Sequence, residues 1–105
     1  MNIYELDSAE RFLIESIREF RFLRAYGYEC SGYSNLGREY SVSFENHSRS
    51  IKIIWQETQD LNVKFQKKSF WSAPKYLDKL GVKRLPTSMK TLAKLIQSDY
   101  MHLIA

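Results

Sequence analysis

The chain of 105 residues is long enough for one hydrophobic core and too short for two, so we expect a single domain over residues 1–105. Hydrophobic residues make up 44% and charged residues 27%, which excludes the weakly hydrophobic composition of disordered chains. The net charge of +4 is unevenly distributed, because residues 67–105 carry eight basic and two acidic side chains. The first two thirds of the chain are slightly acidic.

The first predicted element is a helix that begins at Asp7 and runs to about Ala25. Asp7 and Glu10 have the spacing of a capping box, in which side chains satisfy the free N–H groups of the first turn. Apolar residues then recur at steps of three and four, which places them on one stripe of a helix. The stripe consists of Ala9, Phe12, Leu13, Ile17, Phe20 and Leu23. Gly27 follows, where a left-handed residue commonly ends a helix.

The middle of the chain predicts four strands joined by short polar turns. A weak first strand covers residues 28–33, and apolar residues alternate with polar ones over 40–45, 51–56 and 61–66. This period of two places the apolar side chains of the last three strands on one face. They are Tyr40, Val42, Phe44, Ile51, Ile53, Trp55, Leu61, Val63 and Phe65. The opposite face is polar except for Ile54, so we expect helices to cover only the first face.

The last third predicts two further helices. Ser72, Pro74 and Gly81 are typical of the start and end of a short helix over residues 72–81. Thr87 or Ser88 is expected to cap a final helix with an apolar stripe over residues 89–104. The predicted fold class is therefore α+β, a four-stranded antiparallel meander with helices packed on one face, in the order α-β-β-β-β-α-α.

Three segments carry a resemblance to known proteins. They are the helix end with its aromatic-Gly-aromatic step at 20–28, the strand at 40–46 and the strand at 51–55, followed by a serine-containing loop and a leucine-rich helix. This pattern resembles a broad set of small bacterial α+β proteins, some of which are immunity proteins of toxin–immunity pairs. The resemblance implies a cytoplasmic protein that binds and blocks a partner. It transfers no functional residues, because those proteins share no active site.

No catalytic or metal-binding motif is evident. His47 falls in a predicted turn and His102 near the C-terminus, and nothing in the sequence places either beside Cys30. Cys30 is interpreted as a small buried strand residue rather than a reactive thiol. One cysteine and two distant histidines do not make a zinc site. We therefore expect no enzyme and no cofactor, although a carboxylate pair assembled by folding remains open for Glu29, Glu39, Glu45 and Glu57.

The expected location is the cytoplasm. A single cysteine excludes an intramolecular disulfide, which suits a reducing compartment. The N-terminal residues lack the basic and apolar regions of a signal peptide. No window approaches the roughly 18 apolar residues of a membrane-spanning helix, so no membrane association is expected.

The basic last third is the strongest candidate for a binding surface. Its cations alternate with aromatic residues, a composition suited to an acidic protein partner or to nucleic acid. A solvated lysine surface is the third alternative. Ile54, alone among polar neighbours, is a further candidate contact. The candidate partner-binding residues are Lys67, Lys68, Phe70, Trp71, Lys75, Tyr76, Lys79, Arg84 and Ile54.

The leading functional hypothesis is a non-enzymatic protein-binding module, an immunity or inhibitor protein that blocks a bacterial toxin with an acidic surface by occlusion. The alternative is a nucleic-acid-binding module that uses the basic C-terminal third. The oligomeric state stays open, because an exposed edge strand can pair across a dimer.

Overall fold

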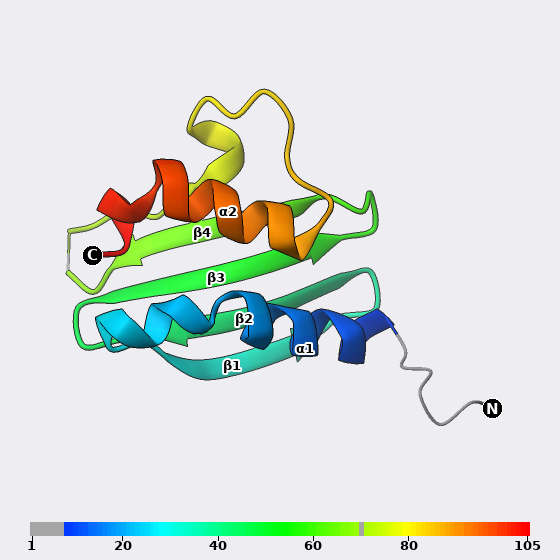
Figure 1. Ribbon diagram of the computed structural model, residues 1–105, viewed down its shortest axis with the longest axis horizontal. Coiled ribbons are helices and arrows are strands. Elements are labelled where there is room, and N and C mark those ends of the chain that lie inside the picture. Colours follow the sequence, from blue (N-terminus) through cyan, green and yellow to red (C-terminus); the bar gives the residue numbers. More distant parts are fainter. Residues whose placement is uncertain (1–7, 70) are drawn as a thin grey trace.

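A computed structural model describes residues 8–69 and 71–105. Helices α1 (Ser8–Glu19) and α2 (Met89–Asp99) lie on the same face of an antiparallel sheet and run in the same direction (Figure 1). The strands follow one another in sequence order across the sheet. They are β1 (Glu29–Asn35), β2 (Glu39–Glu45), β3 (Arg49–Gln56), β4 (Leu61–Lys67) and β5 (Lys75–Tyr76). The α+β class and the antiparallel meander are confirmed.

The period of two in the sequence identified the covered face of the sheet correctly. Val42, Ile53 and Val63 lie opposite one another on β2, β3 and β4, and all three are fully buried. α1 and α2 cover this face and bury their own apolar stripes against it (Figure 1). The burial of apolar side chains from both layers forms one continuous core, which is the main stabilising contribution in a domain of this size.

The predicted count of four strands is wrong, and so is the helix predicted over residues 72–81. Lys75 and Tyr76 form the short strand β5, which pairs with Phe65 and Lys64 of β4. A single 3-10 turn, η2 (Leu77–Lys79), follows and buries Leu77 completely. Pro74 keeps the residue before it out of the helical region, which disfavours a helix here. The edge of β4 offers free main-chain groups, with which residues 75–76 pair as a strand.

The first helix is shorter than predicted. α1 ends at Glu19, and a 3-10 helix, η1 (Arg21–Tyr26), continues the chain to Gly27, whose φ of 80° confirms the expected left-handed end. A 3-10 helix has three residues per turn, so Phe20 and Leu23 point the same way and are both buried. Ile17 was wrongly included in the buried stripe, because its side chain is 40% exposed. The predicted cap Asp7 lies outside the described residues.

β1 differs most from its prediction. It runs from Glu29 to Asn35 rather than over 28–33, and its register against β2 shifts between Cys30 and Gly32, as in a β-bulge. Cys30 is exposed, which corrects the expectation of a buried cysteine. The reason is that β1 is an edge strand, which among the described residues has a neighbouring strand, β2, on one side only.

The two sides of the sheet differ in how far their main-chain groups are covered. Along β4, the edge is covered by β5, by a hydrogen bond from the Leu61 N–H to the Pro86 carbonyl at 2.9 Å, and by η2, where the Asp78 N–H donates to Asn62 Oδ1 at 3.2 Å. Along β1, no strand pairs with the outer side anywhere in residues 8–69 and 71–105. β1 is therefore an open edge (Figure 1).

The C-terminal helix begins as predicted but is shorter than the expected 89–104, because α2 ends at Asp99 and a 3-10 turn, η3 (Met101–Leu103), follows. Ser88 is the N-cap of α2, and its Oγ accepts a hydrogen bond from the Thr91 N–H at 3.5 Å. Met89, Leu92 and Ile96 are buried against the sheet as expected from the apolar stripe. Among the described helices, none combines the length and the apolar character needed to cross a membrane.

Candidate functional site

The structure distributes the described partner-binding candidates over several elements. Ile54 lies on the uncovered face of the sheet, half-buried between Ser41 and Asn62 of the neighbouring strands. Both neighbours are buried, which corrects the expectation that this face is fully exposed to water. Lys79 and Arg84 are exposed on η2 and on the segment that leads to α2.

The remaining described candidates lie at the end of β4, in the segment that follows it and on β5. The Lys68 Nζ lies 3.3 Å from the Glu45 carboxylate, so this lysine already has an acidic partner within the chain. Trp71 is 88% exposed, and Phe70 lies outside the described residues. Tyr76 is exposed on β5 opposite Lys64.

Two of the predicted lysines meet in a basic hollow, which we define by Arg49, Lys67 and Lys75. Arg49 at the start of β3 is the direct cross-strand neighbour of Lys67, and Lys75 begins β5. The hollow has a volume of about 110 Å³, and Phe65 and Leu103 supply its apolar lining. No acidic side chain in the described part of the chain pairs with these three cations. The hollow is suited to an anionic group.

A second candidate surface was not predicted. Five of the seven exposed large hydrophobic residues belong to α1, η1, β1 and the turn that follows β1, while Trp71 and Tyr76 are the other two in the described residues. We call these five the β1 edge surface. They are Ile14, Ile17, Tyr26, Tyr33 and Leu36. Because α1 packs on β1 and β2, these residues flank the open edge of the sheet.

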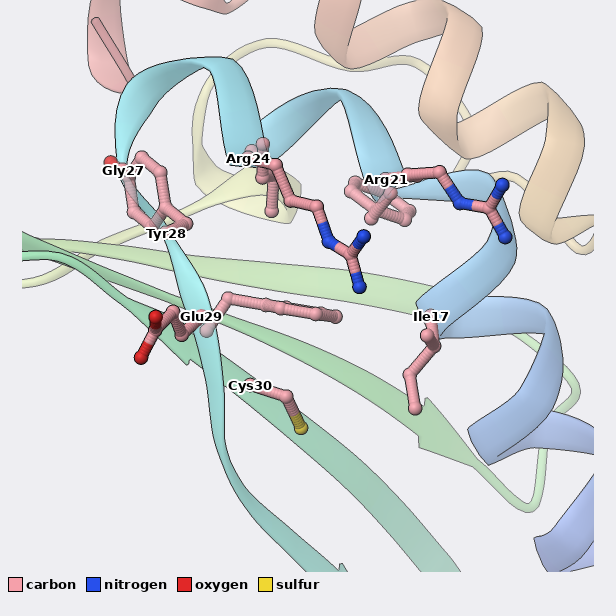
Figure 2. Close-up of a pocket in the computed structure, with 10 residues that line it drawn as sticks. Ile17, Arg21, Arg24, Gly27, Tyr28, Glu29 and Cys30 are labelled. Carbon is pink, nitrogen blue, oxygen red and sulfur yellow. The ribbon is translucent and has the colours of Figure 1, made fainter.

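A groove of about 510 Å³ runs between β1 on one side and α1 and η1 on the other. We call it the β1 groove. Figure 2 shows Ile17 and Arg24 on the helical side, Cys30 on the strand side, and the Glu29 carboxylate pointing away. Buried residues of the core line the rest of it, and they are Phe20, Leu23, Tyr28 and Phe44. Arg21 completes the helical wall, so the groove combines an apolar floor with two cations.

Tyr28 closes one end of the β1 groove and has a structural role. Its Oη donates a hydrogen bond of 2.9 Å to the carbonyl oxygen of Ile104. Burial raises the pKa of Tyr28 above its ordinary value, and the positive charge of Arg49 opposes this shift only in part. Tyr28 is therefore a neutral hydrogen-bond donor at physiological pH.

The acidic, cysteine and histidine side chains with catalytic potential lie mainly at the end of the sheet where β1 begins. Glu29 and Glu45 are cross-strand neighbours at the outer end of β1, but Glu45 pairs with Lys68. Cys30 and His47 line one open depression, and no hydrogen bond joins them. Within residues 8–69 and 71–105, no three His, Cys, Asp or Glu side chains gather in a way that could hold a metal ion.

Sequence reasoning missed the β1 edge surface because it treated the outer side of the first helix as an ordinary wet face. Two signals were present. Ile14 precedes Ile17 by three residues, which places two isoleucines on one side of a helix next to Arg21. Tyr33 lies in a segment, 29–35, whose other residues are small or polar.

Over residues 8–69 and 71–105, the fold defines a small α+β domain with an open antiparallel sheet, helices α1 and α2 on one face, and β1 as an uncovered edge strand. Comparison with protein-family models, with curated proteins and with solved structures found no match to this chain.

Proposed function

We propose that this protein is a non-enzymatic protein-binding module that engages its partner through the β1 edge surface. The observation that supports this proposal is that, among the described residues, five of the seven exposed large hydrophobic residues belong to β1, to the turn after it, and to α1 and η1. Groups of exposed apolar residues commonly mark interaction sites, and tyrosine is enriched among the residues that contribute most to binding at protein interfaces.

The proposed mode of action is occlusion. The surface is carried by a helix and a strand that share the core, so it is preformed and little conformational entropy is lost on binding. Arg21 and Arg24 border the apolar residues, and their positive charge accelerates encounter with an acidic partner. An inhibitor or immunity protein needs only these properties, since it blocks its target by covering the active site.

Nucleic-acid binding is the second candidate function, and the basic hollow is the observation that favours it. Arg49, Lys67 and Lys75 lie together without an acidic partner in the described part of the chain. Phosphate groups are bound by such clusters, and the affinity then falls steeply as salt rises because counterions are released. Substitution of Lys67 and Lys75 by alanine would flatten this salt dependence.

The test of the main proposal is affinity capture from nuclease-treated native lysate with the tagged protein and two variants. Ile17→Glu places a charge in the β1 edge surface, whereas Ile54→Ser alters the opposite face as a matched control. We expect the wild type and Ile54→Ser to retain one protein in near-stoichiometric amount. Calorimetry with the purified partner should show an affinity loss of about tenfold or more for Ile17→Glu.

Two results would contradict the proposal. One is a partner whose affinity is unchanged by Ile17→Glu and falls with Ile54→Ser, which would move the interface to the open face of the sheet. The other is retention of nucleic acid alone, lost when Lys67 and Lys75 are replaced, which would favour the second candidate function.

A further inference from the structure

The open edge of β1 carries main-chain groups as well as the apolar side chains already described. We propose that the partner contributes an extended acidic segment, which adds to β1 as a sixth strand. Alternate side chains of this segment would enter the β1 groove. This inference rests on the proposed function. This binding mode, strand addition, uses main-chain hydrogen bonds for affinity and pockets for alternate side chains for specificity.

The hydrogen-bond pattern of the β1–β2 hairpin shows which main-chain groups face outward. The Leu36 N–H donates to the Glu39 carbonyl at 2.9 Å across the turn. In an antiparallel ladder, residues that bond to the neighbouring strand alternate with residues that face away from it. The bonds of Ser34 are therefore directed to Ser41, and the N–H and C=O groups of Tyr33 and Asn35 point outward.

The side chains of Tyr33 and Asn35, whose main-chain groups point outward, lie on the same face of the sheet as the groove. Tyr33 and Asn35 are cross-strand neighbours of Val42 and Tyr40, and Cys30 is the neighbour of Phe44. All three partners on β2 belong to the face that α1 covers. A strand added outside β1 would thus direct every second side chain toward α1 and η1, where Ile17 and Arg24 line the groove (Figure 2).

The charge of the groove determines the chemistry of the segment. Neither Arg21 nor Arg24 forms an ion pair within the described part of the chain, and Glu29 points out of the groove. The side chains at the alternate positions that face the groove would include acidic ones, which pair with these cations, and apolar ones, which contact Ile17. A second copy of β1 fits less well, because Glu29 is its only acidic residue.

The β-bulge limits where regular pairing can occur. The register shift between Cys30 and Gly32 bends the strand, and bulges at edges commonly prevent indiscriminate pairing. Regular hydrogen bonds are thus available at Tyr33 and Asn35, beyond the bulge. A bound segment would pair there and continue over the groove beside Cys30, where side-chain contacts replace main-chain ones.

The test selects binders from a displayed library of random peptides of about eight residues, longer than an average strand. We expect the selected peptides to be enriched in Asp and Glu. Their affinity should fall about tenfold with Arg24→Glu and much less with Lys90→Glu, which makes the same charge change on α2. Methylation of single peptide amides should abolish binding at every second position only, since alternate N–H groups face β1.

Hydrogen exchange of the protein supplies the second measurement. The Tyr33 and Asn35 amides should exchange rapidly in the free protein and at least tenfold more slowly when peptide is bound. The Val63 amide in the centre of the sheet should not change.

The outcomes separate this inference from the proposed function. Binders that lose affinity with Ile17→Glu but show no alternation with methylation and no slowing at Tyr33 would overturn strand addition and leave the protein-binding proposal standing. Binders that are indifferent to Ile17→Glu would overturn both, whereas a selection that yields none would overturn strand addition alone. A concentration-dependent dimer that protects Tyr33 and Asn35 without peptide would replace the acidic segment with a second copy.

Discussion

The hydroxyl of Tyr28 donates a 2.9 Å hydrogen bond to the carbonyl oxygen of Ile104, and so joins the segment before β1 to the C-terminal turn of the chain. Both residues are almost completely buried. The bond spans most of the sequence and satisfies a carbonyl that has little access to water. It therefore couples the position of the edge strand to the packing of the C-terminus.

Replacement of Tyr28 by phenylalanine should lower the free energy of unfolding at pH 7 by about 1–3 kcal/mol, because the Ile104 carbonyl is left buried without its donor. Urea denaturation measures this change. Tyr76→Phe, at an exposed position on β5, is the control and should have little effect. Equal stability of the Tyr28→Phe variant and the wild type would show that the hydrogen bond contributes nothing net.

The same tyrosine predicts a loss of stability in alkaline solution. Burial holds the pKa of Tyr28 above its unfolded value of 10.0, so the folded state keeps its proton while the unfolded state releases it. This contribution to stability is complete below the unfolded pKa and is lost as pH rises through the folded pKa. Denaturation curves from pH 8 to pH 11 should fall more steeply for the wild type than for Tyr28→Phe. Parallel curves would contradict the raised pKa.

Gly27 should not tolerate a side chain. Its φ of 80° is left-handed, a conformation that costs other residues about 1–2 kcal/mol, so Gly27→Ala is expected to lower stability by that amount. Gly32→Ala is the matched control. Gly32 lacks a positive φ and has open space around its Cα, so alanine there should be neutral or slightly stabilising. Thermal denaturation distinguishes the two, and equal losses would refute the conformational explanation.

Ser16 lies where α1 approaches α2, and it is fully buried. Its Oγ donates to the Phe12 carbonyl at 2.8 Å and lies 3.9 Å from the Met89 Sδ. A larger side chain would force the two helices apart, so Ser16→Leu should destabilise the fold by about 1–3 kcal/mol. Ser98→Leu, on the exposed side of α2, should change stability by less than about 0.5 kcal/mol. Urea denaturation measures both, and a tolerated Ser16→Leu would mean that the helix contact can repack.

The basic hollow predicts a salt effect on stability. Arg49 and Lys67 are like charges directly opposite each other across two strands, which is unfavourable. Lys67→Glu should raise the free energy of unfolding by about 0.2–1 kcal/mol at low salt, and the gain should shrink as salt rises. Lys83→Glu makes the same change in net charge at an exposed site outside the sheet. Equal gains from both variants would assign the effect to net charge rather than to the pair.

The candidate surfaces were only partly accessible to sequence reasoning. The concentration of positive charge after residue 66 was evident, and Lys67 and Lys75 do lie together. The third residue of the basic hollow, Arg49, is distant in sequence. It lies beside Lys67 only because of the register between β3 and β4. The β1 groove was not predicted at all, because it requires knowledge of which strand ends the sheet.

The sequence by itself determined the class of fold, the buried face of β2, β3 and β4, the start of α2 after Thr87 or Ser88, and the left-handed Gly27. These features follow from periodicity and backbone preference, which act over a few residues. Only the tertiary structure decided that α1 stops at Glu19, that residues 75–76 pair as a strand, and that Cys30 is exposed. Those outcomes depend on which distant segments lie beside each element. An edge strand and a central strand differ in their neighbouring strands rather than in their own pattern of apolar and polar residues.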